Sequence, residues 1–176
     1  LFAVSASAAT LDPDTFLDSA DLGNSGEQEE LDELAAILGV DVDTLAIYEK
    51  YEGSELFYVN EADPLSFYFD IDPSVGWFIL KFGTGQLKDD AGVAVDSHYF
   101  FANDGLELEK AVWLDSDTNN LLSNCFSEGG LYAGASAALG GCKLSHITTV
   151  IPLPAAGWLL LGGLGGLAAL RRRNKV

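Results

Sequence analysis

Hydrophobic residues recur with two different periods along the chain, and the first period predicts a helix. In the stretch EQEELDELAAIL, over residues 27–38, the apolar positions follow the i, i+3, i+4, i+7 spacing of one helix face. Ser25 and Gln28 have the spacing of a capping box before this stretch, and Gly39 provides a stop after it. The pattern therefore predicts a short amphipathic helix whose apolar stripe consists of Leu31, Leu34, Ala35 and Leu38.

From residue 45 onward the period changes to two, which is typical of half-buried strands. LSFYFDI alternates, with Leu65, Phe67, Phe69 and Ile71 on one face and Ser66, Tyr68 and Asp70 on the other. Together with this run, seven short apolar runs are separated by turn-rich pieces over about 100 residues. The other six runs are LAIYEKY, ELFYVN, GWFILKF, VAVDSHYFF, KAVWLD and KLSHITTV.

These patterns predict a mainly β fold, a small β-sandwich-like domain with a short N-terminal amphipathic helix. We expect this domain to cover residues 27–149. Residues 9–26 are polar and show no sustained period, so they are expected to form an irregular lead-in.

The C-terminal part has the composition of a membrane span. Residues 151–170 carry no charge, and a helix of that length extends about 30 Å, the thickness of the hydrocarbon core of a bilayer. Two prolines stand at its start, where their missing N–H groups cost no helical hydrogen bond. A basic end, 171–176, follows with Arg171, Arg172 and Arg173. Because basic residues stay in the cytoplasm, the body is expected on the outer side of the inner membrane.

The opening stretch LFAVSASAAT is typical of the second half of a signal peptide. Small residues at Ala6, Ser7 and Ala8 predict cleavage after Ala8, which leaves residues 1–8 as residual signal peptide. The sequence does not begin with Met, so the first part of the signal is expected to precede it.

The net charge of −18 is distributed very unevenly. All 27 acidic residues precede residue 129 and are opposed by five lysines, so the exported part carries −22, while the tail carries +4. Such a field repels phosphate backbones, which excludes a nucleic-acid-binding role, and it favours cations and neutral or basic polymers.

Cys125 and Cys142 are the two cysteines of the chain. In an oxidising compartment we expect them to form a disulfide. Such a bridge would stabilise the fold by about 3 kcal/mol, because it restricts the conformations of the unfolded chain. Two free thiols are the alternative. Zinc binding is disfavoured because the CxxC spacing of a zinc site is missing.

The tail IPLPAAGWLLLGGLGGLAALRRR resembles the sorting tail of the PEP-CTERM class of bacterial surface proteins, in its VPLPA-type variant. The matching recognition element is Pro152, Leu153, Pro154, Ala155 and Ala156, and Arg171 to Arg173 correspond to the stop. Ile151 stands where the variant usually has Val, and Leu153 stands where the commoner class has Glu. Body segments such as GWFILKFGTG, HYFFAND and LSHITTV are also similar to segments in small members of this class.

This resemblance implies recognition by an exosortase, a membrane-embedded cysteine transpeptidase-like enzyme. It further implies cleavage near the proline element and transfer of the body to the cell surface or to the exopolysaccharide matrix. A plain permanent anchor is the alternative for the same tail. The resemblance assigns no catalytic residue to the body.

The stretch that starts at Asp115 begins like the 12-residue calcium-binding loop of an EF-hand. It places Asp115, Asp117 and Asn119 at positions one, three and five of that loop. Position six is Asn120 instead of Gly, and position twelve is Phe126 instead of a bidentate Glu. We therefore expect no resident metal or other cofactor, and only a looser calcium site or an Asx-type turn remains as the candidate.

Catalytic chemistry is weakly indicated. His98 and His146 are the only imidazoles and stand in strand-like runs, where histidines usually pack, and the GxSxG nucleophile motif does not occur. With 27 acids, a pair of carboxylates at glycosidase spacing would arise by chance. We expect a non-enzyme, with Lys81 and His146 as the positions of interest.

The sequence is therefore compatible with three functions. The first is a non-catalytic exported surface or matrix protein that is sorted by its tail. The second is a calcium-assisted carbohydrate-binding module that uses an exposed aromatic residue such as Trp113, although a Trp in VWL is more often in the core. The third is a secreted hydrolase, which would need a cleft with a carboxyl group of strongly raised pKa.

Overall fold

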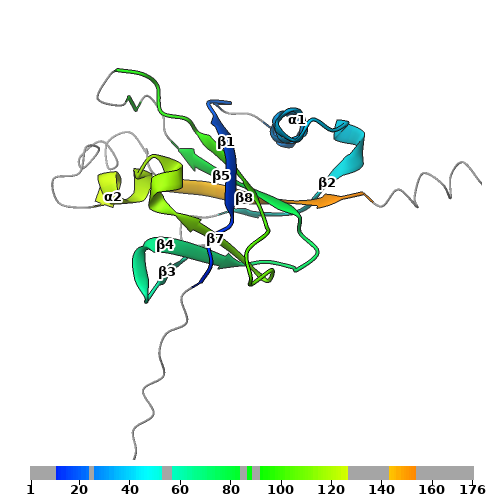
Figure 1. Ribbon diagram of the computed structural model, residues 1–176. Helices are drawn as coiled ribbons and strands as arrows, with labels where there is room; N and C mark the ends of the chain where they lie inside the picture. The colour runs from blue at the N-terminus through cyan, green and yellow to red at the C-terminus, as the bar shows by residue number, and fades with distance from the viewer. Residues whose placement is uncertain are drawn as a thin grey trace, which may run out of the picture.

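Two antiparallel sheets and two α-helices make up the computed structural model (Figure 1), which describes residues 11–23, 26–52, 57–83, 87–88, 92–126 and 143–153. The strands are β1 Thr15–Ala20, β2 Leu45–Glu52, β3 Tyr58–Asn60, β4 Asp63–Asp70, β5 Trp77–Gly83, β6 His98–Ala102, β7 Lys110–Leu114 and β8 Lys143–Pro152. The helices are α1 Glu27–Leu38 and α2 Leu121–Phe126, with 3-10 turns η1 Val42–Thr44 and η2 Asp115–Thr118. The mainly β prediction is confirmed.

Five strands form the larger sheet, in the order β1-β6-β5-β8-β2. The last strand, β8, lies inside this sheet, paired with β5 on one side and β2 on the other. The pairing joins distant parts of the chain, since Leu45 lies opposite Pro152 and Lys81 lies opposite both His98 and His146. The smaller sheet has the order β3-β4-β7.

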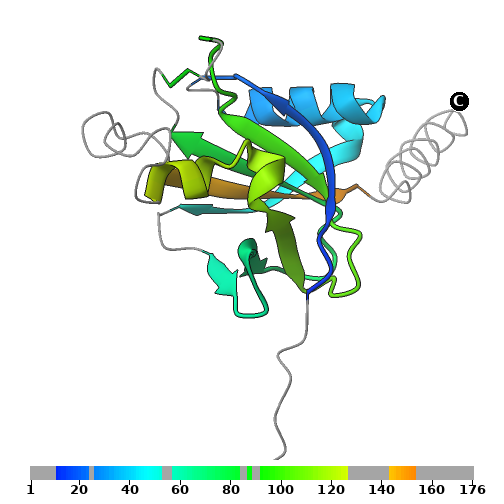
Figure 2. The ribbon, with the colours of Figure 1, turned by 60° about the vertical axis from the view of Figure 1, so that its left-hand side comes forward.

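The main core lies between the two sheets (Figure 2). Alternate residues of β5, Phe78, Leu80 and Phe82, face the smaller sheet and contribute to one continuous cluster with Phe67 and Trp113. Trp113 is fully buried, and its ring lies 5.9 Å from that of Phe67. Trp113 therefore lies in the core, as is more usual for a Trp in VWL, and offers no exposed stacking surface to the alternative carbohydrate-binding function.

The opposite face of the larger sheet is covered by α1 (Figure 2). Leu34 and Ala35 of the helix pack on Ile79, Phe100 and Val150 of three adjacent strands. The predicted helix range 27–38 is confirmed, and the glycine that follows it adopts a left-handed conformation with φ of 67°.

The predicted capping pair at the start of α1 is wrong. The residue before the helix is Gly26, and its N–H donates to the Glu29 carboxylate at 2.8 Å. Glu29 stands three residues after Gly26, so its side chain reaches back to the orphan N–H as in half of a capping box.

The lead-in expected to be irregular contains β1, which pairs with β6 at the edge of the larger sheet. Just before β1, Asp14 connects this strand to β7 of the smaller sheet, since its N–H donates to the carbonyl of Val112. Its carboxylate accepts the N–H groups of Asp104, Gly105 and Val112 at 2.7–2.9 Å. Burial raises the pKa of Asp14, although these three N–H groups act in the opposite direction. The folded domain therefore begins well before residue 27.

Two strand boundaries and the exposure of one strand residue also differ from the sequence pattern. β6 starts at His98, and Ala94, which belongs to the same predicted run, forms a separate bridge with Lys88. Leu65 is 54% exposed where the alternation predicted burial; it lies near the start of β4, and its N–H donates to the Asp63 carboxylate at 3.0 Å. β8 continues to Pro152, three residues beyond the expected end of the domain.

Candidate functional site

The first two residues of the sorting element lie at the end of the larger sheet. Pro152 is the last residue of β8, and the N–H of Leu153 donates to the carbonyl of Thr44 at 2.8 Å. The rest of the element, from Pro154 to Ala156, lies outside the described residues, as do residues 1–8 of the expected signal peptide and Arg171 to Arg173. Within the described ranges no helix is both long and apolar enough to cross a membrane.

The disulfide prediction also falls outside the structure. Cys125 belongs to α2, but its side chain is not described, and Cys142 lies in the undescribed stretch before β8. The pairing of the two sulfur atoms stays a prediction.

The three residues of the candidate calcium site bind groups of the protein. Asp115 is fully buried, and its two carboxylate oxygens accept the N–H groups of Leu122 and Ser123 at 3.0 and 2.9 Å. Asp117 accepts the N–H of Leu114, and the Asn119 amide donates to the Tyr99 hydroxyl. The side chains thus serve η2 and the start of α2, an arrangement closer to the Asx-type turn.

A buried cluster of ionisable groups lies between α1 and the larger sheet. Glu30 is fully buried and accepts hydrogen bonds from His146 Nε2 at 2.8 Å and from the Thr148 hydroxyl at 2.7 Å. His98 Nε2 lies 3.5 Å from the same Glu30 oxygen that binds His146. Lys81, in register between the two histidines on β5, is 9% exposed.

The cluster extends through one further hydroxyl group to the surface. Ser97 Oγ donates to Asp21 and lies 2.8 Å from Nδ1 of His98. Because a hydroxyl has one hydrogen, satisfying both contacts requires His98 Nδ1 to be the donor.

The electrostatics of Glu30 follow from these partners. Burial is the largest influence and acts to raise its pKa, but the hydrogen bonds from His146, His98 and Thr148 together outweigh burial and hold the pKa well below its usual range. The Glu30 carboxylate is therefore ionised, and its hydrogen-bond donors compensate the cost of burying its charge. Since Glu30, Ser97 and both histidines are at most 5% exposed, the cluster joins the helix to the sheet and offers no open face to a substrate.

Among the described ranges, no group of three or more His, Cys, Asp or Glu side chains is arranged to hold a metal ion. In the buried cluster, Glu30 and His146 bond each other directly at 2.8 Å. The carboxylate and the imidazole are already partners.

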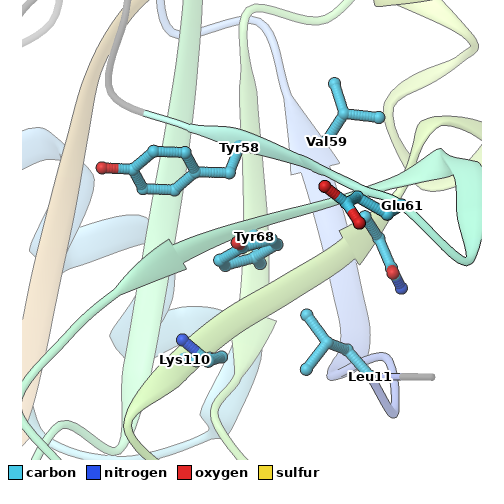
Figure 3. Close-up of a pocket in the computed structure, with 7 residues that line it drawn as sticks. Leu11, Tyr58, Val59, Glu61, Tyr68 and Lys110 are labelled. Atoms are coloured by element: carbon cyan, nitrogen blue, oxygen red, sulfur yellow. The ribbon is translucent and has the colours of Figure 1, made fainter. Parts of the chain in front are cut away.

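A surface pocket of about 360 Å³ lies on the smaller sheet beside its edge strand β3 (Figure 3). Tyr58 and Tyr68, cross-strand neighbours, have ring centroids 5.3 Å apart and an interplanar angle of 31°. In Figure 3 the Tyr68 ring lies between Tyr58 and Lys110, with Leu11 and Glu61 on the other side of the space. The pocket combines aromatic surface with groups of both charges.

Lys110 is held in place at this pocket. Its ammonium lies 4.8 Å from the Tyr68 ring centroid and 2.6 Å from the Asp70 carboxylate. The hydrogen bond with Asp70 raises the pKa of Lys110. The cation therefore stays charged and supports one face of the Tyr68 ring.

The sequence partly identified these groups. Lys81 and His146 were positions of interest, and the structure places His146 against Glu30 and Lys81 opposite both histidines in the sheet. Glu30 itself was missed, although it stands four residues before Leu34 on the buried helix face, and an acid in that stripe is the signal that could have revealed it. Tyr68 was correctly placed on the outer face of its strand, whereas Tyr58 was not singled out.

Comparison of the chain with protein-family models, with curated proteins and with solved structures finds no match.

Proposed function

We propose that this chain is an exported, non-catalytic surface or extracellular-matrix protein. Its C-terminal tail, a Pro-x-Pro element followed by an uncharged span and three arginines, would be recognised and cleaved by an exosortase. Before cleavage the body lies outside the cytoplasm with one span in the inner membrane. After cleavage it belongs to the cell surface or the exopolysaccharide matrix.

The observation that carries this proposal is the junction between sheet and tail. β8 pairs with β5 as far as Val150 and with β2 as far as Pro152, and the last hydrogen bond is that of the Leu153 N–H. All described strands therefore precede Pro154, where the proline element and the uncharged run continue. A cut beyond Leu153 leaves every described strand pairing intact.

The charge distribution supports the same proposal. The tail holds four basic residues after its span, and the part before it carries −22. Strong negative charge keeps a released domain soluble and repels nucleic acid, while neutral polymers of a matrix are not repelled.

Mass spectrometry of the mature protein, from cells with and without the sorting enzyme, tests the proposal. We expect a new C-terminus near Pro154 only when the enzyme is present. Recovery of intact Arg171–Val176 in both strains would overturn the proposal in favour of a permanent anchor.

Two tail variants sharpen this experiment. Pro154→Ala alters the element beyond the last described hydrogen bond, so it should block cleavage without unfolding the domain. Asn174→Ala, in the basic end, is the matched control and should be processed like the natural chain. Equal processing of both variants would contradict recognition of the proline element.

A further inference from the structure

We propose that the pocket beside β3 binds a sugar ring of a neutral polysaccharide. Its volume of about 360 Å³ falls in the range of sites for small molecules and single sugar units. It is lined by residues of three segments, the start of the described chain at Leu11, the β3–β4 hairpin, and β7 at Lys110.

Tyr58 provides the aromatic surface of this pocket (Figure 3). It is 57% exposed, and it stands on the edge strand. Its ring is supported by Tyr68, and the Tyr68 ring is in turn supported by Lys110, which Asp70 holds. A ring fixed from behind loses little conformational entropy when the C–H face of a sugar packs against it.

Polar groups surround the aromatic surface. Glu61 offers acceptors, Lys110 offers donors, and the Asn60 side chain is fixed by accepting the N–H of Ala62. Sugar hydroxyl groups both donate and accept hydrogen bonds. A mixed set of donors and acceptors around an aromatic ring therefore matches a sugar ring better than a purely apolar ligand.

The charges of the site favour a neutral ligand. An anionic sugar would approach Glu61 and Asp70 in the field of a body with a charge of −22, and a cationic ligand would approach Lys110. A neutral sugar meets neither repulsion. Binding here does not require the tail to be cut, so the result is independent of the mass spectrometry above.

The test is an NMR titration of the isotope-labelled full chain with oligosaccharides. The chain is kept in a polyoxyethylene detergent, because sugar-based detergents would compete for the pocket. The probes are cellohexaose, maltohexaose and mannohexaose as neutral oligomers and oligogalacturonate as the anionic one. We expect at least one neutral oligomer to shift the amide signals around Tyr58, Tyr68 and Lys110, and oligogalacturonate to bind more weakly.

Tyr58→Ala should lower the affinity for that oligomer about tenfold, as loss of an aromatic anchor commonly does. Tyr48→Ala is the matched control, because Tyr48 is also exposed, at 45%, but belongs to β2 and does not line the pocket. It should change the affinity by less than about twofold. Tyr58→Phe keeps the ring and should keep binding, which separates loss of the ring from any loss of fold.

Three results would overturn the inference. The first is the absence of binding by every neutral oligomer at millimolar concentration. The second is equal affinity of the natural chain and a folded Tyr58→Ala variant. The third is tighter binding of oligogalacturonate than of the neutral oligomers.

Discussion

Replacing Glu30 with glutamine removes a charge from the interface between α1 and the larger sheet while keeping the side-chain volume. Glu30 accepts from His146 at 2.8 Å and from Thr148 at 2.7 Å. Hydrogen bonds to a charged acceptor contribute about 1 kcal/mol more than neutral ones, and the new amide N–H₂ group faces a donor at a cost of about 1–3 kcal/mol. Glu30→Gln should therefore lower the free energy of unfolding by about 3 kcal/mol.

The measurement is urea denaturation of the chain ending at Leu153, which keeps every described element and buries Trp113 as a fluorescent probe. Glu27→Gln is the matched control on the same helix, because its carboxylate is exposed and lies 3.9 Å from Lys50. An exposed pair of this kind contributes about 0–1 kcal/mol. If the two variants lost equal stability, the buried cluster would not hold the helix and the reasoning would be refuted.

The pH dependence of this loss has a defined sign. The pKa of Glu30 is lower in the folded chain than its ordinary value of 4.5, so its contribution is complete above that pH and is lost as the pH falls toward the folded pKa. The difference in free energy of unfolding between the natural chain and Glu30→Gln should be constant from about pH 7 to pH 5 and should shrink below about pH 4.5. A difference that stays the same at about pH 3.5 would contradict a lowered pKa.

Four further predictions concern other parts of the chain. Gly105→Ala would place a Cβ 2.9 Å from a main-chain oxygen and 3.1 Å from Asp14 Oδ1, so urea denaturation should show a loss of about 1–3 kcal/mol. Asp115→Ala should cost about 1–2 kcal/mol by removing the acceptor of two helix N–H groups. Calcium should leave the thermal midpoint of the natural chain unchanged, and a rise abolished by Asp115→Ala would contradict this. Alkylation without reductant should leave Cys125 and Cys142 unmodified, and labelling of both would contradict the disulfide.

The sequence predicted elements whose burial is periodic. The stripe of α1 and the alternation of Phe67 and Phe69 in β4 were readable because each element buries one face against a neighbour, and a regular neighbour imposes a regular pattern. β1 was missed for the same reason: Thr15, Phe16 and Asp18 are exposed on an edge strand, so the pattern is weak. Its position depends on pairing with β6, about 80 residues away, which local sequence does not encode.

The sites were less predictable than the fold, because their members come from distant strands. Glu30 and His146 are 116 residues apart. Regular pairing of β5 with β8 holds His146 opposite Lys81, just before a register shift at Phe82. Tyr58 meets Tyr68 through a hairpin that also contains a register shift. The composition of each stretch named candidate residues, but register decided which of them share a face.

Strand β8 connects the buried cluster to the proposed sorting of the tail. His146 and Thr148 bind Glu30, and Pro152 ends the same strand, so the proline element begins four residues after the last contact with the cluster. Beyond Val150, β8 pairs with β2 alone, and strand ends of this kind open at low free-energy cost. Under the proposed sorting, unpairing Pro152 and Leu153 would therefore leave the rest of β8 in the sheet, where the contacts of Glu30 hold it.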